Sequence, residues 1–144
     1  MQQTIAAPPR VQPLGKPGDL ADIIVAVLSL ATIDHGLKKV SSPDFYRLFQ
    51  RLIEEFPRKF PPITFERSGR YVYSKVLGDA LERALRLGVQ VMNPRFLYLG
   101  IEEAEDAQRN LELIGENTGK AFIENLRPVA DRLVNLLPRV EVGS

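Results

Sequence analysis

The stretch from Tyr73 to Ala107, YSKVLGDALERALRLGVQVMNPRFLYLGIEEAEDA, contains the changes of periodicity that decide the fold. Its first part has apolar residues at helical spacing from Tyr73 or Ser74 onward, and it ends at Gly88, a residue type that often ends helices. The part from 89 to 99 alternates, is rich in strand-forming residues and has a turn signal at its centre. Helical spacing then returns. The stretch therefore predicts a helix, a short hairpin and a second helix, in that order.

Two further helices are expected before this stretch. Asp19 is placed to cap the first one, whose apolar residues continue to Gly36 and make it apolar on nearly every side. Ser42, followed by a proline, predicts the start of the second helix, which runs to Phe56. The residues from 57 to 72 include three prolines and predict a long irregular connection.

The C-terminal part is expected to be helical but interrupted. Gly115 and Gly119 weaken the helical pattern, and Pro128 predicts a kink or a restart. Beyond these glycines, one apolar stripe consists of Phe122, Leu126, Val129, Leu133 and Leu136, and a second consists of Ile123, Ala130, Val134 and Leu137. Two stripes are more apolar surface than a small core usually takes from a terminal helix. They predict either completion of the core or self-association through this helix, and the pattern leaves both open.

The passage from 73 to 107 resembles the helix, hairpin and helix of winged helix-turn-helix domains. The resemblance covers about a quarter of the chain and concerns the order of elements. It implies a mainly α fold with a small β-hairpin, a winged-helix-like helical domain followed by a C-terminal helix. Such domains serve both as DNA readers and as protein-interaction modules, so the resemblance favours a fold more than a function.

Composition limits the chemistry that can be expected. The chain has 144 residues, which suits one domain, here 19–144, after a proline-rich arm at 1–18 that we expect to be flexible. It has no cysteine and a single histidine, so no catalytic residue, metal site or cofactor is predicted. Its most apolar run, 20–33, contains Asp22 and is shorter than the approximately 20 residues that a membrane span needs. A cytoplasmic protein without membrane contact is expected.

Charge is divided between two segments although the net charge is only +1. The segment 58–95 carries a net charge of +5, and 96–126 carries −5. Two acid–base pairs four residues apart, Asp79 with Arg83 and Glu82 with Arg86, are expected to neutralise part of the basic segment. The cations then left for phosphate contact are Arg58, Lys59, Arg67, Arg70, Lys75 and Arg95.

Two other groups invite a catalytic interpretation that we do not favour. Asp34 and His35 adjoin, but neighbouring helical residues point in different directions, and a histidine in the last turn suits the helix dipole. Four acidic residues between 102 and 106 are expected to form a first helical turn rather than a metal site. The sequence thus predicts a non-catalytic helical module that acts through protein contacts, as a homodimer or with another protein. The alternative is a winged-helix nucleic-acid-binding protein.

Overall fold

A computed structural model describes residues 18–69, 71–92 and 98–141 of the chain. Helices account for most of this part, as the sequence predicted. They are α1 (Leu20–His35), α2 (Ser42–Glu55), α3 (Lys75–Leu87), α4 (Ala104–Thr118) and α5 (Lys120–Glu141), with a short 3₁₀ helix, η2 (Pro57–Lys59). The strands are β1 (Val40–Ser41), β2 (Glu66–Ser68), β3 (Tyr71–Tyr73), β4 (Gln90–Met92) and β5 (Tyr98–Gly100).

Helix α1 is the centre of the fold. All but four of its sixteen residues are buried, because α3, α4 and α5 pack around it. Its first turn is closed by Asp19, whose side chain accepts a hydrogen bond from the Asp22 amide at 3.2 Å. Gly36, with φ of 73°, ends it in the left-handed conformation that glycine adopts without strain. Both ends lie where the sequence predicted them.

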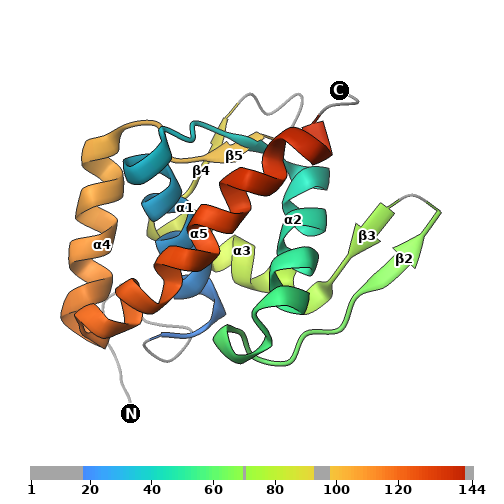
Figure 1. Cartoon of the computed structure of the whole chain (residues 1–144), viewed down its shortest axis with the longest axis horizontal. Coiled ribbons are helices and arrows are strands. Elements are labelled where there is room, and N and C mark those ends of the chain that lie inside the picture. The colour runs from blue at the N-terminus through green and yellow to red at the C-terminus, as the bar shows by residue number, and fades with distance from the viewer. Residues whose placement is uncertain (1–17, 70, 93–97, 142–144) are drawn as a thin grey trace, which may run out of the picture.

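Helix α5 crosses the outside of α1 and α2, while α4 stands at one end of the molecule (Figure 1). The break between these two helices falls at Gly119, and α5 continues through Pro128 without a restart. The interruption therefore lies at one of the two predicted glycines, and the predicted restart at Pro128 is wrong. One uninterrupted α5 therefore covers the core.

Two small antiparallel sheets flank the helices. The first has the strand order β1-β5-β4, so β5 lies between a strand that precedes α2 and one that follows α3. Gly100 at the end of β5 is required there, because a Cβ at this position would overlap the Lys38 carbonyl oxygen. The β4–β5 pair is the hairpin expected between 89 and 99. The order of helices and strands is compatible with a winged-helix-like topology.

The second sheet is a hairpin that the sequence analysis missed. Strands β2 and β3 pair within the segment that was predicted to be an irregular connection, and they project away from the helices opposite α4 (Figure 1). A smaller correction concerns α2, whose N-cap is Ser41 rather than Ser42: the Ser41 hydroxyl accepts from the Asp44 amide at 3.2 Å.

Part of the predicted organisation lies outside the described residues, namely the proline-rich arm up to residue 17 and the two cations Arg70 and Arg95. Within the part that the structure describes, no helix is long and apolar enough to cross a membrane.

Candidate interaction surface

The β2–β3 hairpin sorts its side chains onto two faces. The pairs are Glu66 with Tyr73, Arg67 with Val72 and Ser68 with Tyr71. Because paired residues share a face and successive residues alternate, Tyr71 and Tyr73 lie on one face, and Arg67 lies on the other. Gly69, with φ of 61°, forms part of the turn.

The base of the hairpin is held against α2 by aromatic contacts. The Tyr73 ring lies 5.3 Å from the Tyr46 ring, and Tyr46 packs edge-on against Phe45 at 5.5 Å. Phe45 is fully buried, so this chain of rings connects the hairpin to the core. Gly78 of α3 leaves room for the two tyrosines, since a Cβ there would lie 3.0 Å from the Tyr46 hydroxyl and 3.3 Å from the Tyr73 hydroxyl.

Tyr46 is the half-buried member of this group. Burial raises the pKa of the Tyr46 hydroxyl above its usual range, and the neighbouring Tyr73, Glu82 and Asp79 add to the rise. The Tyr46 hydroxyl therefore keeps its proton to a higher pH than an exposed tyrosine does.

Three large apolar or aromatic side chains are exposed in the six residues from 71 to 76, which include β3 of the hairpin and the start of α3. Tyr71 is 69% exposed, and Tyr73 and Val76 are each 49% exposed. They are three of the six exposed large hydrophobic residues in the described part of the chain, so their concentration in one short segment stands out from an ordinary scatter. We call these three residues the hairpin surface.

The structure distributes the predicted phosphate-binding cations over three elements. Arg58 and Lys59 lie in η2, Arg67 lies on β2, and Lys75 begins α3. Lys75 contacts Asp79 at 3.4 Å, so its charge is partly neutralised. Arg67 lies on the face of the hairpin opposite the two tyrosines. The four described cations therefore do not form one patch with the aromatic side chains.

The expected pairing along α3 differs in detail from the structure. Asp79 pairs with Lys75, and Arg83 contacts Asp19 at 3.6 Å, so the predicted pair of Asp79 with Arg83 is wrong. The predicted pair of Glu82 with Arg86 is not formed among the described residues either. The exposed face of α3 mixes both charges with apolar residues; it consists of Lys75, Val76, Asp79, Glu82, Arg86 and Leu87. A helix that enters a DNA groove is usually more basic than this.

The C-terminal residues that were candidates for self-association lie in the core of the single chain. Val129 and Leu133 are 0% exposed, and Leu126 and Leu136 are 2% and 5% exposed. Phe122 is half-buried and packs against the same core. Of the two interpretations that the stripes left open, the structure shows completion of the core. A second copy would need another surface.

Ion pairs on the outside of α5 attach it to the ends of α1 and α2. Arg132 donates two hydrogen bonds to Glu55, at 2.7 and 3.0 Å, and Arg51 donates a third at 2.8 Å. These contacts lower the pKa of Glu55 to about 2. Asp34 accepts from Arg127, and the His35 Nε2 lies 2.7 Å from Asp131. Asp34 and His35 thus have separate partners and do not act on each other.

The four acidic residues between 102 and 106 were expected to form a first helical turn, and the structure confirms this for two of them: α4 starts at Ala104, Glu103 is its N-cap residue, and Glu102 precedes the helix. Glu105 and Asp106 lie in its first turn, where negative charge is stabilised by the helix dipole. In the described ranges, no group of three or more histidine, cysteine or acidic side chains is placed to hold a metal ion.

Comparison of the chain with known protein families, curated proteins and solved structures found no match.

Proposed function

We propose that this protein is a non-catalytic interaction module that binds another protein chain through the hairpin surface. The observation that carries the proposal is the exposure of Tyr71, Tyr73 and Val76 within one short segment. Tyrosine is favoured at protein interfaces because it combines a large contact area with a hydroxyl that can stay solvated. Exposing two tyrosines and a valine to water has a cost that a partner would remove.

One residue of the hairpin surface, Tyr73, is held in place before any partner binds. Tyr73 packs on Tyr46, and Tyr46 packs on the buried Phe45. A side chain that is already fixed loses little conformational entropy on binding, so more of its contact energy contributes to affinity. Tyr71, further from the base, is the most exposed of the three residues.

The backbone of the hairpin supports the same proposal. β2 and β3 form a two-stranded sheet in which, within the described ranges, each strand has one edge without a strand partner. Such edges can accept an added strand from another chain, and they are usually blocked where binding would be harmful. Tyr71 and Tyr73 would then supply side-chain contacts next to the backbone hydrogen bonds.

Site-specific photo-crosslinking tests this proposal. A photoreactive amino acid replaces Tyr71 in one variant and the exposed Glu116 of α4 in a control, and both are expressed in the native cells. We expect discrete protein adducts from position 71 and few from position 116. Equal adducts at both positions, or adducts at 71 that contain nucleic acid alone, would contradict the proposal.

Self-association remains a prediction, with the hairpin surface in place of the C-terminal helix as the binding site for a second copy. Light scattering at rising concentration measures the mass directly. A mass above one chain that falls to one chain in Tyr71→Ser would identify the partner as a second copy, whereas a monomer at every concentration would leave a different protein as the partner.

The second candidate function is a winged-helix nucleic-acid-binding protein. It is favoured by the β1-β5-β4 order of the sheet and by the exposed Arg58 and Arg67. If it is correct, affinity for a mixed-sequence duplex should fall steeply with salt, and changing Arg67, Arg70 and Lys75 together to glutamate should abolish binding. We expect weak, sequence-independent binding at most, because α3 has a mixed charge.

A further inference from the structure

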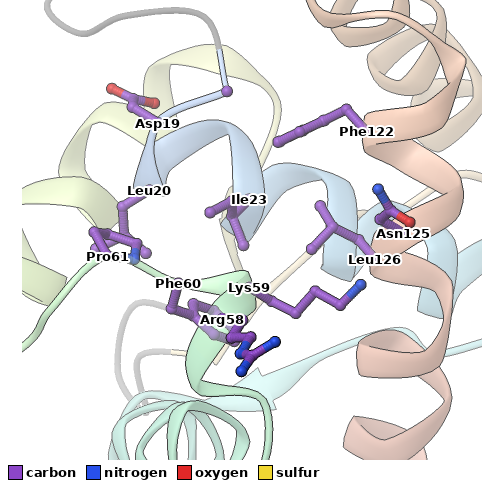
Figure 2. Close-up of a pocket in the computed structure, with 11 residues that line it drawn as sticks. Asp19, Leu20, Ile23, Arg58, Lys59, Phe60, Pro61, Phe122, Asn125 and Leu126 are labelled. Carbon is purple, nitrogen blue, oxygen red and sulfur yellow. The ribbon is translucent and has the colours of Figure 1, made fainter.

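A cavity of about 660 Å³ lies at the opposite end of α1 from β1, where the start of this helix meets η2 and the start of α5 (Figure 2). Its volume falls within the range of roughly 300–1,000 Å³ that is usual for small-molecule sites. It is separate from the hairpin surface, and the proposed protein-binding function does not use it.

The walls of this cavity are mainly apolar. Leu20 and Ile23 come from α1, Phe60 follows η2, and Phe122 and Leu126 come from α5. Figure 2 shows these side chains converging on the space from three directions. Four of them are almost fully buried and belong to the packed core, so the half-buried Phe122 provides the most accessible part of the apolar wall. An apolar chain would find a preformed surface here.

The charged groups around the cavity are not equivalent. Asp19 is already occupied, since it caps α1 and contacts Arg83 at 3.6 Å. Arg58 and Lys59, by contrast, have no acidic partner among the described residues. The Lys59 side chain extends from η2 toward α5, where Asn125 lines the facing wall (Figure 2). The uncompensated charge at the cavity is therefore positive.

We propose that this cavity binds a free amphipathic carboxylate, such as a medium-chain fatty acid. The alkyl chain would lie among Ile23, Phe60 and Phe122, where its burial removes apolar surface from water. The carboxylate would lie at Lys59, with the Asn125 amide as a second donor. A cationic head group would not be favoured here, because Asp19, the acidic residue of the lining, is already paired with Arg83.

Titration calorimetry with dodecanoate tests the proposal on the full chain. We expect saturable binding of one molecule. Lys59→Glu should weaken it about tenfold or more, because a charge-assisted hydrogen bond is lost and a repulsion is added. Dodecanol, which has the same chain without the charge, should bind wild type and Lys59→Glu alike. Lys120→Glu, an equal charge change on α5 outside the lining, is the matched control and should leave dodecanoate binding unchanged.

Two further variants and two further ligands complete the test. Phe122→Ala should weaken dodecanoate and dodecanol alike, because it removes part of the apolar wall. Lys59→Gln provides a second test of the charge should Lys59→Glu fail to fold by circular dichroism. No saturable binding, equal effects of the Lys59 and Lys120 changes, or equal binding of dodecyltrimethylammonium would overturn the proposal. So would binding of phosphatidylglycerol vesicles without binding of free dodecanoate, since that would indicate a membrane surface.

Discussion

Replacing Leu133 by alanine tests whether α5 belongs to the core of one chain. Leu133 is 0% exposed, and its helix packs on α1 and α2, so the substitution leaves a cavity that its neighbours fill only in part. Substitutions of this kind cost about 2–5 kcal/mol, against a total stability of about 5–15 kcal/mol. At roughly 2–4 °C for each kcal/mol in a domain of this size, the melting temperature should fall by about 4–20 °C.

The assay is urea unfolding followed by circular dichroism, with light scattering for the mass. Leu113→Ala is the matched control, because the same atoms are removed from a leucine of α4 that is 52% exposed. Its free energy of unfolding should change by no more than about 0.5 kcal/mol. The assignment of α5 to the core would be refuted if Leu133→Ala kept its stability and lost mass, because that result describes an interface. The double change of Leu126 and Leu133 to aspartate should likewise unfold the chain rather than release a folded monomer.

Three further outcomes are expected. The pKa of Glu55 is lowered from 4.5 to about 2 in the folded state, so its contribution to stability is complete above pH 4.5 and is lost as the pH falls toward about 2. The urea midpoints of wild type and Glu55→Gln should therefore differ at neutral pH and converge over this window. A difference that stays constant with pH would refute the role of the ionised Glu55 carboxylate in stability. Gly100→Ala should destabilise the fold by more than 1 kcal/mol, as an order of magnitude, because its Cβ meets backbone, whereas Gly115→Ala in α4 should be near neutral in the same urea assay. Deleting residues 1–17 should barely change the melting temperature in a thermal scan; a fall of many degrees would show that this segment packs on the fold.

Local signals in the sequence were sufficient to predict most of the helices. Asp19 and Ser74 cap α1 and α3, and Gly36 and Gly88 end them, because capping depends on residues next to one another in the chain. The β2–β3 hairpin was missed because its strands carry no such local signal. Its strands have three residues each and are mostly exposed, so they lack the buried alternation by which a strand is recognised.

The candidate sites depended on information that the sequence does not hold locally. The stripes of α5 showed that a face is apolar, but not whether α1 and α2 or a second copy covers it. The pairs of Glu55 with Arg132 and of His35 with Asp131 join residues 77 and 96 positions apart, and periodicity carries no signal at that distance.

The most direct test of the central claim is the affinity of the crosslinked partner for wild type, Tyr71→Ser and Leu113→Ser, measured by titration calorimetry with purified proteins. Tyr71 and Leu113 are both exposed and lie on different elements, so the two changes remove comparable apolar surface from different places. If the hairpin surface is the contact surface, Tyr71→Ser should weaken binding about 30-fold, as expected for an interface residue worth about 2 kcal/mol, and Leu113→Ser should not. Binding by Tyr71→Ser that equals wild type, or a larger loss in Leu113→Ser, would contradict the claim.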